Sequence, residues 1–539
     1  MVELFGTSSF IPGHTDSHQL TSPASRRTNM NKTLACLLLL ALLLAAPVFA
    51  TDQTPAAKPA ASATPAPKER KSVTHGRVSV NGKTIRYTAT AGTILLRNAK
   101  NEPTASMFYV AYTMDGVRDP AKRPVTFIYN GGPGSSSVWL HMGGIGPVRV
   151  VTEDHTSTPP PPYDIVSNPN TLLNATDLVF IDAVGTGYSR PVDKGTDKMF
   201  WGVDQDVNSF GQFIQRYVSD NNRWNSPKFL LGESYGTTRS ANLADWLQQN
   251  GVALNGVILL SSVLNYGDGW PSTDLSEITY LPSYAAVAWY HHALPQQPAH
   301  LAAFVQQVEQ FASTEYAHAL FEGTRLPAAE YDQVVQKLHE YTGLSEQYIR
   351  QVNLRINMMR FRAQLLRDRG RTIGRLDARF EGYNRDNAEE YPDYSDMSAA
   401  ITPAYTAAFN WYAQNQLKYL SQRPYVILND QTIRHWDWKH PVPGSFFPVP
   451  LPDVAPNLAD AMRKNPNLMI FSGNGYFDLG TPFYKTEYDF AHMKLPPDLL
   501  KNVSFHFYHS GHMLYLHEHT LMDLHRDLSA FYTEALARH

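Results

Sequence analysis

Short runs of apolar residues recur along the chain, and each has about the length of one buried strand. They are residues 124–129, 178–182, 228–231, 256–260 and 468–471. Because these runs are apolar throughout instead of alternating, they are typical of strands that are covered on both faces of a sheet. Residues 204–218 and 235–249 lie between some of them and have the periodicity of helices. This alternation predicts an α/β fold with a mostly parallel central sheet and helices on both faces.

Residues 73–114 have a different pattern, in which polar and apolar residues alternate and glycine turns interrupt them. Val78 and Val80 precede an Asn81-Gly82 pair, and residues 84–87 continue the alternation after it. Asn-Gly is preferred in two-residue hairpin turns, because both positions need a positive φ. This segment therefore predicts antiparallel hairpins.

The strand–helix alternation breaks down between residues 266 and 450. Long amphipathic segments, residues 301–315 and 328–341, predict helices there. We interpret residues 266–450 as a largely helical insertion, a cap, within a single α/β domain. Residues 73–265 and 451–539 form the two parts of that domain.

The first 50 residues have the pattern of a targeting leader. Its basic residues are Arg26, Arg27 and Lys32. The apolar run 34–46 follows, and residues 48–50 resemble a small-x-small cleavage site. The run has about 13 residues, against roughly 20 for a membrane span, so we expect a signal peptide and no stable membrane anchor. Met30 is the expected start, and residues 51–72 form an Ala/Pro-rich linker.

Composition and charge limit the class of protein. The chain has 539 residues, of which 43% are hydrophobic, so it can bury a large core. A formal net charge of −3 argues against nucleic acid or an anionic membrane as a partner. Cys36, the only cysteine, lies in the leader, so the mature chain has no disulfide and no thiol nucleophile. Export without cysteine indicates a bacterial-like periplasmic or secreted protein.

A Gly-Glu-Ser-Tyr-Gly sequence occupies residues 232–236, between a strand-like run (228–231) and a helix-like run (237–243). This is the setting of a nucleophile elbow, in which glycines permit a tight bend and the serine hydroxyl projects above the sheet edge. The five-residue pattern alone is common by chance, and the flanking strand and helix strengthen it. The pattern predicts that Ser234 attacks a carbonyl group and forms an acyl-enzyme.

A glycine-rich stretch, Asn-Gly-Gly-Pro-Gly-Ser-Ser-Ser, follows the strand-like run 124–129 and begins at Asn130. Adjacent glycines allow the backbone to come close to a nucleophile and to direct an N–H group at it. We expect the N–H groups of Gly132 and Tyr235 to form an oxyanion hole. The alternatives are a plain turn or a phosphate-binding loop. The stretch lacks the Gly-Lys-Ser/Thr ending of a nucleotide loop.

Candidates for the acid and the base lie late in the chain. Asp478 follows the run 468–471, and His512 follows a strand-like segment at residues 503–508. Serine, acid and histidine in this order are typical of enzymes with a nucleophile elbow. His512 is expected to accept the proton of Ser234, and Asp478 to orient the imidazole ring.

Several histidines near the C-terminus allow a second interpretation, a metal site. They are His506, His509, His512, His517 and His519. They surround an aromatic, strand-like segment instead of one helix face, and no His-Glu-x-x-His pattern is present. We expect no metal and no other cofactor.

Three of these motifs together resemble the serine carboxypeptidase family of the α/β-hydrolase superfamily. They are Asn-Gly-Gly-Pro-Gly, Gly-Glu-Ser-Tyr-Gly and Gly-His-Met, in that order. Ser135, the Asp-Ala-Val-Gly-Thr-Gly-Tyr-Ser segment at 182–189 and the Tyr-Phe-Asp-Leu-Gly-Thr-Pro block at 476–482 are most similar to bacterial members. The resemblance covers residues 75–265 and 450–539, and it implies an α/β-hydrolase fold.

The resemblance also implies roles for individual residues. The catalytic residues are Ser234, Asp478 and His512, the oxyanion hole is Gly132 and Tyr235, and the substrate-binding residues are Asn130, Gly131, Glu233 and Met513. In this family an asparagine and a hydrogen-bonded pair of glutamates bind the C-terminal carboxylate of the substrate. Asn130 and Glu233 match this motif, but the second glutamate is Gly144 in this sequence.

The missing glutamate weakens two implied properties. Glu233 has one reason fewer for a raised pKa, so a preference for acidic pH is less expected. Another donor could contribute to carboxylate binding. The candidates are His141, Arg149 and Arg239, although a structural role is expected for each.

The sequence therefore predicts a serine-type carboxypeptidase that releases C-terminal residues from peptides. One alternative is a related serine hydrolase or acyltransferase that acts on esters or amides without a free carboxylate, and Gly144 favours it. A catalytically silent binding protein is the other. The filled positions Ser234, Asp478 and His512 argue against the silent protein.

Overall fold

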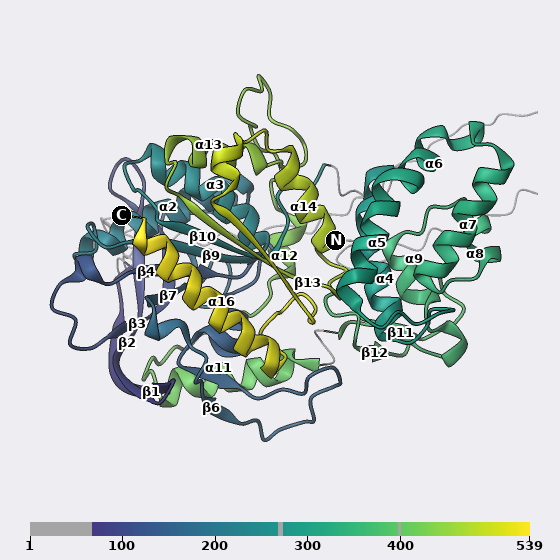
Figure 1. Cartoon of the computed structure of the whole chain (residues 1–539). Coiled ribbons are helices and arrows are strands. Elements are labelled where there is room, and N and C mark those ends of the chain that lie inside the picture. Colours follow the sequence, from purple (N-terminus) through teal and green to yellow (C-terminus); the bar gives the residue numbers. More distant parts are fainter. Residues whose placement is uncertain (1–66, 268–272, 397–399, 539) are drawn as a thin grey trace, which may run out of the picture. The chain divides into compact units, whose positions relative to one another are not determined.

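A computed structural model describes residues 67–267, 273–396 and 400–538 of the chain (Figure 1). The predicted leader, the start at Met30 and the linker up to residue 66 lie outside the described residues. Strand β1 begins at Lys71, so the sheet includes the last two residues of the range that the sequence assigned to the linker.

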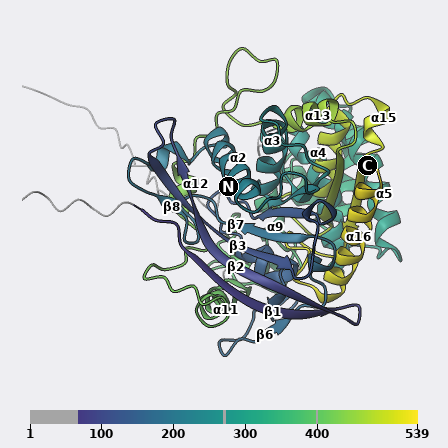
Figure 2. The ribbon, with the colours of Figure 1, turned by 90° about the vertical axis from the view of Figure 1, so that its left-hand side faces the viewer.

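Ten strands of the described ranges form one sheet, in the order β1-β2-β3-β7-β4-β9-β10-β13-β14, with β8 paired to β3. The parallel strands are β4 (Val125–Tyr129), β7 (Asp177–Ile181), β9 (Lys228–Ser234), β10 (Gly256–Ser262), β13 (Met469–Gly475) and β14 (Val503–Tyr508). The antiparallel strands are β1 (Lys71–Val80), β2 (Lys83–Arg97), β3 (Pro103–Met114) and the short β8 (Arg190–Pro191). Figure 2 shows β1, β2 and β3 along one margin of the sheet. The predicted mostly parallel sheet is confirmed.

The first hairpin has the turn that its sequence predicts. Val80 pairs with Lys83 across Asn81 and Gly82, whose φ values are +49° and +75°. Both values lie in the left-handed region that Asn and Gly tolerate best. The turn therefore fixes the register between β1 and β2.

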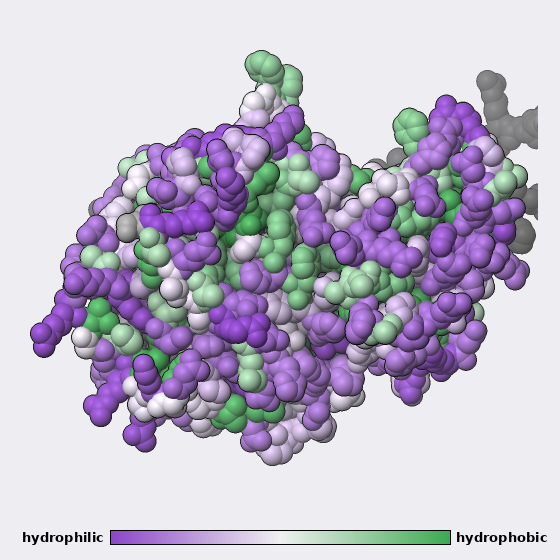
Figure 3. Space-filling view, viewed as in Figure 1, coloured by the Kyte–Doolittle hydropathy of each residue, from purple (hydrophilic) through white to green (hydrophobic). Residues whose placement is uncertain are grey.

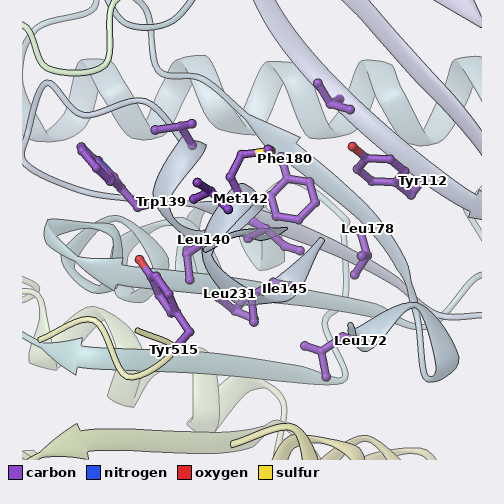
Figure 4. Packing of buried hydrophobic residues seen from close by; sticks show 14 of the residues in the cluster. Tyr112, Trp139, Leu140, Met142, Ile145, Leu172, Leu178, Phe180, Leu231 and Tyr515 are labelled. Atoms are coloured by element: carbon purple, nitrogen blue, oxygen red, sulfur yellow. The ribbon is translucent and has the colours of Figure 1, made fainter. Parts of the chain in front are cut away.

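Helices cover both faces of the sheet. One face packs on α2 (Val203–Asp220), α3 (Tyr235–Gln249) and α13 (Ala455–Lys464). The other packs on α11 (Thr402–Asn415), α16 (Glu518–Ala537) and the short α1 (Val138–Leu140). Each face buries its own cluster of apolar residues, the first cluster on the side of α2 and the second on the side of α11. In β4, Phe127 belongs to the first cluster and its neighbour Ile128 to the second, which explains why the strand is apolar throughout. Figure 4 shows the second cluster.

The insertion between β10 and α13 is largely helical. Its helices are α4 (Asp274–Tyr290), α5 (Leu301–Phe311), α6 (Ala317–Glu322), α7 (Ala328–Thr342), α8 (Glu346–Gln351), α9 (Met358–Gln364), α11 and α12 (Asp430–Arg434). The predicted helix at 301–315 is present: α5 passes through a π-type turn at Ala312–Tyr316 and continues into α6. Two short strands, β11 (Thr372–Ile373) and β12 (Glu381–Gly382), pair with each other.

The insertion does not form a single cap. Helices α4 to α9 have an apolar core of their own, which also takes in Phe477 and Phe483 from the segment after β13. Helix α11 instead packs in the core beside the sheet, through residues such as Tyr405 and Phe409. Its apolar face is needed to cover the sheet, so the insertion belongs partly to the core of the α/β domain.

The remaining elements connect these layers. They are β5 (Val148–Val150), β6 (Ile165–Ser167), α14 (Phe483–His492) and α15 (Pro497–Leu500). The face in Figure 3 is mainly hydrophilic, with hydrophobic residues scattered over it. Within the three described ranges, no helix is both long enough and apolar enough to cross a bilayer.

Candidate active site

The elbow forms where the sequence predicts it. Strand β9 ends at Ser234, and helix α3 begins at Tyr235. Ser234 has φ +60° and ψ −130°, a conformation that costs a residue with a side chain of order 1–3 kcal/mol. A Cβ atom on Gly232 would lie 2.2 Å from the backbone oxygen of Gly236. The bend therefore requires glycine at position 232, and it holds the half-buried Ser234 at the carboxyl end of a central strand.

We expect Gly232→Ala to lower the free energy of unfolding by about 1–3 kcal/mol, because the backbone oxygen of Gly236 cannot move aside cheaply. The displaced elbow should also react more slowly with a fluorophosphonate probe. Denaturant unfolding and the rate of labelling measure the two effects. Gly251→Ala is the control for a glycine replacement without a clash, since no atom lies within 4 Å of its added Cβ; Gly251 has a positive φ, +76°, which Gly232 lacks. A Gly232→Ala protein with the stability and labelling rate of the control would contradict this account.

The glycine-rich loop passes directly against the elbow. A Cβ atom on Gly131 would lie 2.4 Å from the nitrogen of Tyr235, so the loop approaches the first amide of α3 as closely as a backbone can. The N–H groups in the first turn of a helix have no intrahelical acceptor, which leaves that of Tyr235 available for a ligand. Gly132 is the next residue of the loop and has φ +107°, a value that favours glycine.

The acid and the histidine are in direct contact. Asp478 Oδ2 lies 2.7 Å from His512 Nδ1, and it also accepts a hydrogen bond from Thr481 Oγ1 at 2.5 Å. Asp478 Oδ1 accepts hydrogen bonds from the N–H groups of Gly480 and Thr481, at 2.7 and 3.0 Å. Burial alone would lower the pKa of His512, but the charge of Asp478 and its hydrogen bond outweigh burial and leave that pKa raised.

The histidine loop lies beside the elbow. Ser234 and Ser262 are register partners in β9 and β10, and the hydroxyl of Ser261 donates to the backbone oxygen of His512 at 2.7 Å. Among the described residues, no hydrogen bond joins Ser234 Oγ to His512 Nε2. Hydrogen bonds of this kind commonly tighten only when substrate binds.

The insertion holds both loops in place, which the sequence did not indicate. The backbone oxygen of Arg375 accepts from the N–H of Leu479 at 3.0 Å, next to Asp478. The backbone oxygen of Leu376 accepts from the N–H of His512 at 2.7 Å. One short segment of the insertion therefore fixes the acid loop and the histidine loop relative to each other.

Asn130 and Glu233 form a buried pair next to the nucleophile. Asn130 Nδ2 donates to Glu233 Oε1 at 2.8 Å, and Asn130 Oδ1 accepts from the N–H of Leu140 at 3.0 Å. The two side chains are only about 2% exposed. The Leu140 N–H fixes which end of the Asn130 amide faces Glu233.

Glu233 does not need a second carboxyl group to hold its proton. Burial is the largest cause that raises its pKa, to about 7. The nearby His512 and the hydrogen bonds from Tyr515 and Asn130 lower the pKa, and Asp478 raises it. The expectation that the change to Gly144 removes a reason for a raised pKa therefore understated the effect of burial.

The three candidate donors have structural partners. His141 is buried, lies 2.7 Å from the hydroxyl of Tyr112 and has its pKa lowered to about 3 by burial. Arg239 forms a buried ion pair with Asp206 at 2.6 Å, and Arg149 lies 3.4 Å from Glu518. Arg239 also donates to the backbone oxygen of Asn130 at 2.8 Å, so it holds the start of the glycine-rich loop in place.

Met513 and the C-terminal histidines other than His512 pack against neighbouring residues of the fold. Met513 is 5% exposed and belongs to the apolar cluster that includes α11 and α16, so substrate contact by its side chain stays a prediction. His506 stacks on Phe471, and His517 lies 3.1 Å from Asp154. In the described parts of the chain, no group of three His, Cys, Asp or Glu side chains could hold a metal ion.

Comparison with known proteins finds a matching family and several relatives. The family model described as serine carboxypeptidase matches residues 84–497. The pheromone-processing carboxypeptidase KEX1 of Ogataea parapolymorpha is 28% identical over 158 residues, which cover 28% of this chain and 22% of that protein. The protein of the same name from Yarrowia lipolytica is 28% identical over 200 residues, 36% of this chain and 29% of that protein. The matched segments thus span less than a third of either relative.

A solved structure extends the likeness over most of the chain. The crystal structure of Kex1(Δ)p, a prohormone-processing carboxypeptidase from Saccharomyces cerevisiae, has a TM-score of 0.52 to this chain. The sequence identity is 15%, and the match covers 83% of this chain and 92% of that one. At this identity the likeness shows a shared fold, and the roles of individual residues have to be argued from their own geometry.

Proposed function

This chain belongs to the serine carboxypeptidase family, and from that premise we propose that it releases residues from the C-terminal end of peptides through an acyl-enzyme. The observation that carries the proposal is the contact of His512 Nδ1 with Asp478 Oδ2, 2.7 Å long, beside the strained elbow at Ser234.

The proposed chemistry follows from that arrangement. Ser234 Oγ attacks the carbonyl carbon of the last peptide bond while His512 Nε2 takes the hydroxyl proton. The N–H groups of Gly132 and Tyr235 stabilise the negative oxygen that forms. His512 then gives the proton to the amine of the leaving residue, and water hydrolyses the serine ester by the same route. Asp478 stabilises the imidazolium at each step.

We assign recognition of the substrate's carboxylate to Asn130 and Glu233, together with the backbone at Gly131. Glu233 keeps its proton up to about pH 7, because burial raises its pKa to about 7. A neutral carboxyl group can donate a hydrogen bond to a substrate carboxylate, whereas a charged one would repel it. In this proposal, the specificity for a free C-terminus depends on a buried acid instead of a surface cation.

The rate of peptide cleavage should therefore depend on pH in a way that reveals the substrate's carboxylate. We expect kcat/KM for a peptide acid to rise with pH as His512 loses its proton, and to fall as Glu233 loses its proton near pH 7. Burial is the main cause of that pKa; His512, Tyr515 and Asn130 also face Glu233 and lower it, and Asp478 raises it. The corresponding peptide amide should show the rising limb alone.

The matched variant is Glu233→Gln, which keeps a donor but cannot ionise. Its profile for the peptide acid should lose the falling limb and keep the rising one. A falling limb that persists in Glu233→Gln would show that another group controls carboxylate binding. A falling limb for the amide would show the same.

The competing function is a hydrolase or acyltransferase for substrates without a free carboxylate, which Gly144 favours. Cleavage of a blocked dipeptide acid and of its amide distinguishes the two, with products identified by mass. We expect the acid to be cleaved at least tenfold faster in kcat/KM, the discrimination that roughly one buried hydrogen bond gives. Equal rates would exclude a carboxypeptidase while leaving the serine chemistry of Ser234 intact.

We also propose export to a periplasmic or extracellular location and a bacterial-type place within the family. The support is the leader pattern at residues 1–50, the absence of cysteine after Cys36, and Ser135 in the glycine-rich loop. Detection of the mature N-terminus by mass spectrometry after expression with residues 30–539 would test the export signal.

A further inference from the structure

Gly144, where the family resemblance places a second glutamate, has no room for a side chain. It lies in a π-type turn at His141–Ile145. A Cβ atom added to Gly144 would lie 2.6 Å from Leu521 Cδ1 and 2.7 Å from Tyr515 Cβ. Both distances are shorter than real contacts of this kind, so Tyr515 and Leu521 occupy the space that a side chain at position 144 would need.

Tyr515 reaches the same carboxyl group that the missing glutamate would meet. Its side chain is 1% exposed and belongs to the apolar cluster that contains Trp139 and Leu140 (Figure 4). Its hydroxyl donates to Glu233 Oε1 at 3.3 Å. Burial and the adjacent Glu233 carboxyl raise the pKa of Tyr515 well above its ordinary value, so the phenol stays a neutral donor.

The hydrogen bonds of Glu233 leave one of its oxygens free. Oε1 accepts from both Asn130 Nδ2, at 2.8 Å, and Tyr515 Oη, at 3.3 Å. Oε2 is buried and has no hydrogen-bond partner among the described residues. Since two donors occupy Oε1, the proton of neutral Glu233 belongs on Oε2, and a buried donor without a partner is costly unless a ligand accepts from it.

We propose that Tyr515 replaces the absent second glutamate as the positioning residue of the carboxylate site, by holding Glu233 with its free oxygen turned toward the substrate. This inference rests on the proposed function. Tyr515 acts through Glu233: it fixes the rotamer of the acid and, with Asn130, directs the remaining proton at the C-terminal carboxylate. The absence of a side chain at Gly144 then leaves the space that the Tyr515 side chain occupies.

Tyr515→Phe tests this directly, because it removes the hydroxyl and keeps the buried ring. We expect KM for a blocked dipeptide acid to rise about tenfold and kcat to change less than twofold. KM for the matching amide should not change, so the acid-to-amide ratio of kcat/KM falls about tenfold. Since the Tyr515 hydrogen bond lowers the pKa of Glu233, the falling limb of the pH profile should also move to higher pH.

Tyr508→Phe is the matched control. The Tyr508 hydroxyl donates to Asp527 Oδ2 at 3.0 Å, and Tyr508 is 5% exposed, so this variant also breaks a part-buried bond between a phenol and a carboxylate. It should leave the acid-to-amide ratio unchanged. A double variant, Glu233→Ala with Tyr515→Phe, should bind the acid as weakly as Glu233→Ala alone, within twofold, because both changes act on one interaction.

The outcomes separate the inference from the proposed function. A wild-type preference for the acid that is unchanged in Tyr515→Phe overturns the role of Tyr515 and leaves the carboxypeptidase intact. Additive losses in the double variant overturn it also. A wild-type protein without preference for the acid overturns both, whereas fluorophosphonate labelling of Ser234 reports on the serine chemistry in every case. Should Tyr515→Phe fail to fold, an acid-to-amide ratio that Glu233→Ala leaves unchanged would still overturn the inference, because Tyr515 acts only through Glu233.

Discussion

Replacement of Ser234 by alanine is expected to lower kcat for peptide cleavage by about 10⁴–10⁶-fold. In the proposed reaction the Ser234 hydroxyl forms the acyl-enzyme, and the strained backbone at Ser234 holds it at the carboxyl end of β9. Alanine can adopt the same backbone, so KM and the unfolding midpoint should change little. Steady-state kinetics with a peptide acid and labelling with a fluorophosphonate probe measure the loss.

The control for this variant is Ser313→Ala. Ser313 lies on the surface of the insertion, and its hydroxyl donates to the backbone oxygen of Glu309, at 2.8 Å. It should keep full activity and full labelling. A Ser234→Ala protein that is still labelled, or still hydrolyses peptides at more than a hundredth of the wild-type rate, would show that another residue is the nucleophile.

The parts of the site that the sequence predicts are the local ones. The bend at residues 232–236 depends on two glycines within five residues, and the turn after β1 depends on Asn81-Gly82. The turn needs positive φ values and the bend needs glycines that carry no Cβ atom, so both can be recognised in the chain without a fold. The strand boundaries also agree with prediction to within a few residues. Their signal is a different one: burial on both faces of the sheet leaves an uninterrupted apolar run along each strand.

The parts that the sequence could not predict depend on contacts between distant segments. Nothing in residues 375–376 marks them as the backbone that holds the loops of Asp478 and His512, because backbone oxygens carry no sequence signal. Gly144 did signal that a glutamate was missing. It could not indicate that Tyr515 fills the space, since an aromatic residue in a buried loop is far more often packing than polar recognition.

The insertion was also harder to predict than the sheet. Its amphipathic pattern predicts helices but not which apolar surface each helix covers. Helix α11 packs beside the sheet through Tyr405 and Phe409, while α4 to α9 pack on one another. Deletion of the insertion would therefore remove core and support as well as any cover of the site.

Replacement of Asp478 by asparagine is expected to lower kcat by about 10⁴-fold, because it puts the wrong tautomer on His512. The acid accepts two backbone N–H groups at Oδ1, and the hydroxyl of Thr481 and His512 Nδ1 at Oδ2. An amide has one oxygen, and the N–H groups of Gly480 and Thr481 are fixed donors that require it. The amide NH₂ group must then face His512 Nδ1, which becomes an acceptor and leaves the proton on Nε2.

A histidine protonated at Nε2 cannot accept the proton of Ser234, whereas the proposed binding of a peptide acid at Asn130 and Glu233 does not involve that nitrogen. KM should therefore change by less than about threefold while kcat falls by about 10⁴-fold, a division that loss of folding would not produce. Asp498→Asn, at an exposed aspartate paired with Lys501, is the control and should retain full activity. Thr481→Val removes one donor to Oδ2 without changing the tautomer, so it should cost only about tenfold. If Asp478→Asn cost no more than Thr481→Val, the acid would serve to hold the loop in place, and the control of the His512 tautomer would have to come from another group.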